Sequence, residues 1–424
     1  MKENKRIIIA HPGCQHSFRV AKALEENGYL YKYVTTVYFK DSSFLMHCLN
    51  FFLSKDNQNR LSKRKCQYID DSKVILFNEI GGLLVLLVLR LDKTRRLYKW
   101  LNEYISRSFQ KKTAKYAIKH NVDAIICYDT NAMVCFNILA QKAPYIIRIM
   151  DNASPARNFL YKIYSEKKDL FGEFIKTYKS FNYLTDRKNA EYFGQEIASA
   201  DFHIAASTFS RKSLIYNNVP EKNILLVPYG VDSSLFNFSP QSCNFENDTL
   251  KILYVGVVDQ RKGISQILNA AKHFSGKDIE FNIVGGRANN FSELYEPYKP
   301  YATFWGTVPF STIKKFYQDN HIFVFPTMGD GFGLVLLEAL SSGLPVITTY
   351  NCAGPDLIQD GENGFLIEAG DTDMLIEKIC WFKNNPQRLR EMSQNARETA
   401  QLYTWEIYEK KLINGINYCM AIKS

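Results

Sequence analysis

Two carboxylates flank a glycine turn in the second half of the chain. Asp330 and Glu338 are eight positions apart, and the Gly-Phe-Gly turn at 331–333 lies between them. The segment 334–340 is mostly apolar and rich in good helix formers, which predicts a buried helix after the turn. A glycine turn that runs into a helix presents unpaired backbone N–H groups, and these suit an anion or a sugar hydroxyl.

Two adjacent cations, Arg261 and Lys262, lie in a second candidate site. They follow a predicted strand at 250–255 and its Gly256, and they precede a predicted helix at 264–273. Breaking a sugar–phosphate bond builds negative charge on the phosphate. A cation that binds this charge more strongly in the transition state accelerates the step. The pair therefore predicts an electropositive site for a phosphate leaving group, and two solvated loop cations are the alternative.

Polar residues also follow predicted strands in the first half of the chain. His16 comes after a strand at 5–10, where it either hydrogen-bonds a sugar or phosphate or caps the next helix. Asp129 comes after a strand at 122–128, where it holds an acceptor hydroxyl, stabilises positive charge at a sugar carbon, or caps the next helix. Both positions lie where open α/β sheets bind ligands.

The composition indicates a globular protein of two domains. The chain has 424 residues, 46% apolar and 23% charged, which is more than one core usually holds. The apolar run at 83–89 is too short to span a bilayer, and the N-terminus does not resemble a secretory signal. Nine cysteines without a C-x-x-C pair suggest a reducing cytoplasm, and a net charge of +10 favours anionic partners.

Strands and helices alternate along the chain, which predicts an α/β protein with parallel sheets. The expected N-terminal domain covers 1–236, and the polar, aperiodic segment 237–249 is a predicted linker. The second domain covers 250–404, and the last helix lies within 405–424.

Residues 92–119 form a basic segment with nine Lys or Arg and two acids. Apolar and aromatic residues, among them Trp100 and Tyr104, are interleaved at spacings of three and four. A basic amphipathic helix beside an apolar run predicts an element that binds an anionic membrane surface. A solvated helix face over an internal core is the alternative. Nucleic acid is not an expected partner, because no nucleic-acid-binding motif accompanies the charge.

The acid-x7-Glu spacing around Gly-Phe-Gly resembles the E-x7-E motif of retaining family-4 glycosyltransferases, which have the GT-B fold. This chain has Asp330 where Glu is usual, and Val257 where an Arg often follows the first glycine of the phosphate-binding segment. Gly13 loosely matches the family's N-terminal glycine loop. The family's N-domain histidine at a strand end has no match, which leaves that catalytic group unassigned.

The resemblance implies two Rossmann-like domains facing across a cleft, with the last helix crossing back to the first domain. It also implies a nucleotide-sugar donor, a glycan acceptor, retention of anomeric configuration, and neither a metal nor a cofactor. Arg261 and Lys262 would hold the diphosphate, and Glu338 would hold the ribose. Asp330 and the backbone of the turn would hold the sugar. The donor-site residues implied are Gly13, Gly256, Arg261, Lys262, Asp330, Gly331, Phe332, Gly333, Leu334 and Glu338.

The expected activity is sugar transfer to a glycan acceptor, expected to be lipid-linked, in the synthesis of a bacterial O-antigen or capsule. The expected location is the cytoplasm, peripheral to the inner face of the plasma membrane. Two alternatives stay open: a GT-B nucleotide-sugar epimerase, and a non-enzymatic basic protein that binds membrane surfaces.

Overall fold

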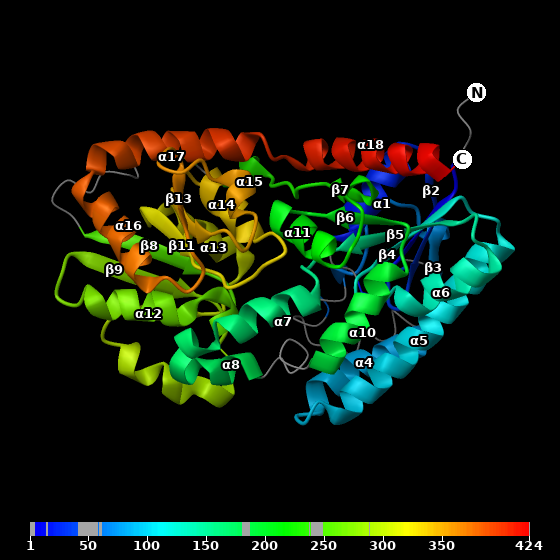
Figure 1. Cartoon of the computed structure of the whole chain (residues 1–424), viewed down its shortest axis with the longest axis horizontal. Helices are drawn as coiled ribbons and strands as arrows, with labels where there is room; N and C mark the ends of the chain where they lie inside the picture. The colour runs from blue at the N-terminus through cyan, green and yellow to red at the C-terminus, as the bar shows by residue number, and fades with distance from the viewer. Residues whose placement is uncertain are drawn as a thin grey trace.

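The computed structural model describes residues 5–13, 16–40, 58, 62–179, 187–236, 238, 249–287 and 289–423. Within these residues the strands form two parallel sheets, one of seven strands and one of six (Figure 1). The orders are β3-β2-β1-β4-β5-β6-β7 and β10-β9-β8-β11-β12-β13. Each order reverses beside its first strand, as in a Rossmann fold. The prediction of two Rossmann-like domains is confirmed.

The first sheet lies within residues 7–226. Its central strands are fully buried, because helices cover both faces, and this explains their uninterrupted apolar sequences. The strands are β1 (Ile7–Ala10), β2 (Leu30–Thr35), β3 (Val74–Leu76), β4 (Ala124–Tyr128), β5 (Ile147–Asn152), β6 (Phe202–Ala205) and β7 (Ile224–Leu226). The accompanying helices are α1 (Ser17–Glu26), α4 (Glu79–Leu91), α5 (Arg96–Lys119), α6 (Met133–Lys142), α10 (Arg187–Ala198) and α11 (Thr208–Tyr216).

The second sheet lies within residues 250–367, and its central strands are equally buried. The strands are β8 (Leu250–Val255), β9 (Ile279–Val284), β10 (Thr303–Gly306), β11 (Ile322–Phe325), β12 (Val346–Thr349) and β13 (Gly364–Ile367). The helices are α12 (Ile264–His273), α13 (Phe310–Gln318), α14 (Leu334–Ser341), α15 (Gly354–Leu357), α16 (Thr372–Asn384) and α17 (Pro386–Gln401).

One segment leaves the first sheet and packs on the second domain. It consists of α7 (Arg157–Glu166), the 3₁₀ helix η2 (Lys168–Phe174) and α8 (Ile175–Lys179), and α8 lies below α12 in Figure 1. The Thr177 hydroxyl accepts the Gln260 N–H at 3.0 Å. This bond joins the segment to the loop that carries the two predicted phosphate-binding cations.

The last helix, α18 (Trp405–Lys423), runs back along the first domain (Figure 1). The Lys22 ammonium lies 2.8 Å from the Glu409 carboxylate, and the Lys423 ammonium lies 2.6 Å from Asp201. These ion pairs attach the helix to α1 and to the start of β6. The predicted return of the final helix to the N-terminal domain is confirmed.

Several elements differ from the sequence-based expectations. The short strand β3 and the helix α6 were not predicted, because three residues and a mixed apolar pattern carry little periodic signal. The apolar run predicted only as a patch is the helix α4. The predicted linker lies outside the described residues except at 238 and 249.

Candidate functional site

The predicted glycine turn lies between the two domains. Gly333 has a φ of 85°, a left-handed conformation that glycine adopts readily, and the helix α14 begins directly after it. A Cβ atom built on Gly331 would lie 2.1 Å from the Ala153 carbonyl oxygen of the first domain. The absence of a side chain at this position therefore allows the two domains to approach each other.

The two predicted cations lie against the turn. The Lys262 ammonium contacts the Asp330 carboxylate, and the Arg261 guanidinium lies 3.6 Å from the same carboxylate. Burial, followed by the charge of Arg261, lowers the pKa of Lys262 well below its ordinary value. A buried ammonium needs an anionic partner to stay charged, so Lys262 favours an anion at this site.

The loop that carries these cations is held in place by its backbone. The Arg261 carbonyl accepts the Met328 N–H at 2.9 Å and the Thr327 hydroxyl at 3.0 Å. The buried Asp259 carboxylate accepts the Lys262 N–H at 3.1 Å, and burial raises the pKa of Asp259. The sequence reasoning assigned no role to Asp259. The structure places it at the start of the cation turn as a cap.

The other predicted donor residues have distinct positions. The Phe332 side chain is buried in the core, and its N–H donates to the Asp330 carboxylate at 3.2 Å. Leu334 is partly exposed at the first position of α14. Glu338 accepts a hydrogen bond from the Tyr317 hydroxyl at 2.7 Å. Burial raises the pKa of Glu338, and the bond from Tyr317 opposes that rise.

Two predicted glycines lie at strand ends. Gly256 follows β8. A Cβ atom built on Gly285 would lie 1.7 Å from the Gly256 carbonyl oxygen, so the two glycines allow a close approach of the backbone. Gly13 follows β1, and its N–H donates to the His11 ring at 2.7 Å. Both positions are at the carboxyl edges of their sheets, where ligands bind in open α/β folds.

His16 lies at the corresponding edge of the first sheet. Its Nε2 is 2.8 Å from the Asp151 carboxylate and 3.3 Å from the Tyr229 hydroxyl. His16 is the N-cap residue of α1, and its carbonyl accepts the Arg19 N–H at 2.9 Å. Its side chain makes no capping bond there, so the alternative of capping by the side chain is wrong. Burial lowers the pKa of His16, but the Asp151 charge and hydrogen bond outweigh burial and leave the pKa raised.

An aromatic contact connects His16 to the turn in the second domain. The ring centroids of His16 and Tyr229 are 4.9 Å apart, and those of Tyr229 and Phe332 are 5.3 Å apart. The N-domain histidine is therefore one aromatic ring away from the glycine turn. No local sequence pattern indicates this contact, because His16 and Tyr229 are 213 positions apart.

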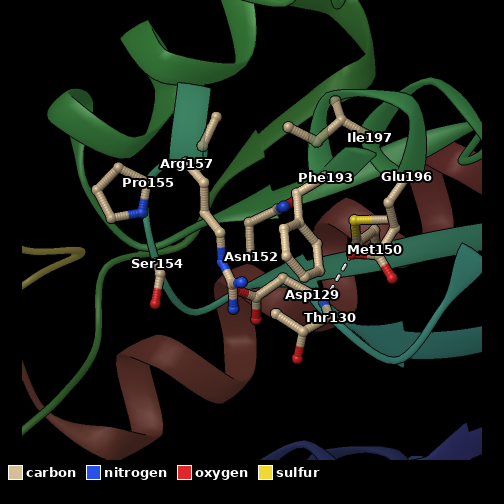
Figure 2. Close-up of a pocket in the computed structure, with 11 residues that line it drawn as sticks. Asp129, Thr130, Met150, Asn152, Ser154, Pro155, Arg157, Phe193, Glu196 and Ile197 are labelled. Carbon is tan, nitrogen blue, oxygen red and sulfur yellow. Dashed lines mark hydrogen bonds between the residues drawn. The ribbon is translucent and has the colours of Figure 1, made fainter. Parts of the chain in front are cut away.

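Asp129 lines a pocket in the first domain (Figure 2). It does not cap α6. Glu196 does so instead, by accepting the Ala132 N–H at 2.9 Å and the Met133 N–H at 3.2 Å, so the capping alternative is wrong here too. Burial and the nearby Glu196 charge raise the pKa of Asp129 to about 7. Asp129 is therefore poised to gain or lose a proton near neutral pH.

Arg157 is a further polar group of this pocket. Its side chain extends toward Asp129 in Figure 2, and its guanidinium lies 3.7 Å from the centre of the Phe193 ring. Its charge opposes the rise in the pKa of Asp129. Sequence reasoning missed Arg157 and Glu196, since neither lies at the end of a predicted strand. Asp151, near the end of β5, is the direct partner of His16.

Comparison with known proteins shows a family similarity in the second half of the chain. Residues 236–399 match the family model of the glycosyl transferases group 1. The match covers less than half of the chain, and within it the sequence is similar to the group 1 glycosyl transferases. The predicted resemblance is thereby confirmed.

Curated relatives match about half of the chain. The sulfoquinovosyl transferase SQD2 of Arabidopsis thaliana is 28% identical over 53% of this chain and 46% of its own length. The capsular polysaccharide biosynthesis glycosyltransferase CapM of Staphylococcus aureus is 26% identical over 54% of this chain and 63% of its own. The chain thus spans roughly half to two-thirds of the length of these relatives.

Solved structures match nearly the whole chain and confirm the GT-B fold. A sucrose-phosphate synthase from Thermosynechococcus elongatus has a TM-score of 0.66 at 17% identity, and the match covers 99% of this chain and all of that one. The lipopolysaccharide outer core galactosyltransferase WaaB has a TM-score of 0.62 at 15% identity, with 97% and 99% covered. The Anabaena protein HepE, solved with UDP and glucose, has a TM-score of 0.61 at 14% identity, with 98% and 100% covered.

Proposed function

We propose that this protein is a retaining glycosyltransferase that moves a sugar from a nucleotide-sugar donor to a glycan acceptor. The observation that carries the proposal is the buried contact of Lys262 with Asp330, beside Arg261, in the region similar to the group 1 glycosyl transferases. Asp330 neutralises part of the positive charge of Arg261 and Lys262. A bound diphosphate would take over part of that role and leave Asp330 available to the sugar hydroxyls.

The cations also account for the chemistry. As the sugar–phosphate bond breaks, charge grows on the leaving diphosphate, and the largely buried side chains of Lys262 and Arg261 would stabilise that charge. Arg261 offers two parallel hydrogen bonds, whereas Lys262 offers a compact charge. With this positive charge supplied by side chains, we propose that transfer needs no metal ion.

The acceptor site in this proposal is the pocket of the first domain. Asp129 and Arg157 provide a carboxyl group and a guanidinium for sugar hydroxyls or an anionic group. Relatives named for capsular polysaccharide biosynthesis support a glycan acceptor in surface polysaccharide synthesis. Asp129 would hold the acceptor hydroxyl, and His16 would face the sugar that is transferred.

An apolar surface on α4 and α5 supports a membrane location. Leu91 on α4 is 70% exposed and Trp100 on α5 is 64% exposed. Gly81 and Gly82 bring the start of α4 close to Ile105 and Thr36. Leu83 and Leu86 pack against Val37, and the opposite side of the helix is exposed. The outward apolar side chains are Ile80, Leu84, Leu87, Leu91, Leu97, Trp100 and Tyr104, which together we call the apolar hairpin face.

Exposed cations lie at one end of the apolar hairpin face. Lys93, Arg95, Arg96 and Lys99 are all exposed at the turn between α4 and α5. The second half of α5 instead buries Phe109 in the core of the first domain. In that half of the helix the alternative prediction, a solvated face over an internal core, is confirmed. Exposed apolar side chains beside a cluster of cations match the interface of an anionic bilayer. None of the helices described is both long and apolar enough to cross a bilayer.

Donor binding tests the proposed activity. A thermal-shift screen against UDP-, GDP-, ADP- and dTDP-sugars would be run on the wild type and on Lys262→Ala and Glu338→Ala. A donor at 100 times its Kd stabilises the protein by about 2.7 kcal/mol. We expect donors with one nucleobase to raise the Tm of the wild type but not of these two variants. Lys272→Ala, at an exposed lysine of α12, is the control and should keep the rise in Tm. A shift that survives in the two site variants would refute the assignment.

Flotation with anionic vesicles at low salt tests the membrane location. We expect the wild type to float and the double variant Leu87→Ser/Trp100→Ser to float less. Leu402→Ser is the matched control, because Leu402 is 68% exposed in the second domain. A wild type that does not float at low salt would refute the location, since electrostatic attraction is strongest there.

A further inference from the structure

The first turn of α11, in the N-terminal domain, is bonded to the glycine turn of the second domain. The Ser207 hydroxyl donates to the Gly331 carbonyl at 2.5 Å, and the Ser210 hydroxyl donates to the same oxygen at 2.9 Å. Both serines are fully buried. A carbonyl that accepts hydrogen bonds from two buried hydroxyls is held firmly. If the carbonyl moved away, both hydroxyls would be left buried without this acceptor, which costs free energy.

A second contact lies beside the first. The Thr208 N–H donates to the Asp356 carboxylate at 2.9 Å, and the Thr208 hydroxyl donates to the other oxygen of the same group. Asp356 belongs to α15 of the second domain. A carboxylate at the N-terminus of α11 is also favoured by the helix dipole. Consecutive residues of one turn thus bind two separate segments of the second domain.

The Gly331 carbonyl controls the orientation of Asp330. In a trans peptide the C=O and the following N–H point in opposite directions. Anchoring the Gly331 oxygen on α11 therefore directs the Phe332 N–H away from the first domain, and this N–H donates to Asp330 Oδ1 at 3.2 Å. The other carboxylate oxygen of Asp330 contacts Lys262. A continuous series of contacts runs from the serine hydroxyls to the predicted donor site.

We infer that Ser207 and Ser210 are positioning residues of the sugar half of the donor site. Their hydroxyls set the plane of the 331–332 peptide, and that peptide orients the Asp330 carboxylate. The donor site is complete only when α11 lies against the turn, so the acceptor domain takes part in binding the donor sugar. This inference rests on the proposed function.

The test compares two serines of α11 that differ in what they bind. Ser210→Ala removes a bond to the second domain. Ser213→Ala makes the same change at an equally buried serine that bonds within the first domain, to the Ala156 N–H at 2.9 Å. Calorimetry would measure the affinity of each variant for UDP-glucose, GDP-mannose, ADP-glucose and dTDP-glucose, and for the nucleoside diphosphate of each.

For the nucleotide sugar that the wild type binds, we expect Ser210→Ala to weaken affinity about fivefold and Ser207→Ala/Ser210→Ala at least twentyfold. Affinity for the matching nucleoside diphosphate should change less than about twofold, because Arg261, Lys262 and Glu338 are untouched. Ser213→Ala should bind both ligands as the wild type does. This split between sugar and diphosphate separates positioning from a general loss of stability.

Two results would overturn the inference. In one, Ser210→Ala and the double variant bind the nucleotide sugar as tightly as Ser213→Ala does. In the other, the affinities for the nucleotide sugar and for the nucleoside diphosphate fall equally, which would mean that the serines only stabilise the fold. A wild type that binds none of the four nucleotide sugars would overturn the proposed function itself, and the inference with it.

Discussion

Replacing Asp129 with Asn should stabilise the protein, and the gain should depend on pH. Burial raises the pKa of Asp129 from 3.8 to about 7. Between these two values the folded protein binds a proton that the unfolded chain releases. The stability contributed by the protonated carboxyl group is therefore complete at low pH and falls as pH rises through this window. Asn cannot ionise, so the variant lacks this loss.

The size of the effect follows from the two pKa values. At pH 8 both states are mostly ionised, and the loss of folding stability is set by the difference of about 3.2 between the two pKa values. At 1.36 kcal/mol per pKa unit this loss is about 4.3 kcal/mol. At pH 5 almost only the unfolded chain is ionised, and the loss of folding stability is about 1.7 kcal/mol. The gain from Asp129→Asn should therefore be larger at pH 8 than at pH 5 by about 2.6 kcal/mol, an upper estimate because neighbouring groups also adjust.

Urea unfolding followed by circular dichroism at both pH values measures this difference. Asp278→Asn, at an exposed carboxylate, is the control, and its effect should be the same at pH 5 and pH 8 within about 0.5 kcal/mol. An equal gain at both pH values, or a loss at pH 8, would refute the reasoning. It would mean that the folded protein keeps Asp129 ionised in this pH range.

Three further predictions concern the turn and its neighbours. Gly331→Ala should lower the Tm by several degrees, because its Cβ would lie 2.1 Å from a carbonyl oxygen of the first domain; an unchanged Tm would contradict the domain contact seen here. Tyr317→Phe should raise the pKa of Glu338 further and weaken donor binding about two- to tenfold at pH 6, with less loss at pH 8. Asp151→Asn should lower the pKa of His16, measured by NMR titration, because the burial of the ring is then less opposed; an unchanged pKa would refute the pairing.

Local patterns in the sequence predicted most of the alternating strands and helices, although β3 and α6 were missed. Apolar runs such as 7–10 and 322–325 predict buried parallel strands, because a strand covered on both faces needs no polar side chain. The glycine turn before α14 and the adjacent cations after β8 were found in the same way. Each depends on neighbouring residues only, and so each is visible in the order of amino acids.

The partners of the site residues were decided by the tertiary structure. His16 meets Asp151 across 135 positions, and Ser207 meets Gly331 across 124. Such pairs depend on which strands are adjacent and how the two domains are docked, and short-range periodicity contains neither. Asp129 shows the consequence: the sequence predicts an acid at a strand end, but its pKa is set by the burial and neighbouring charge that folding creates.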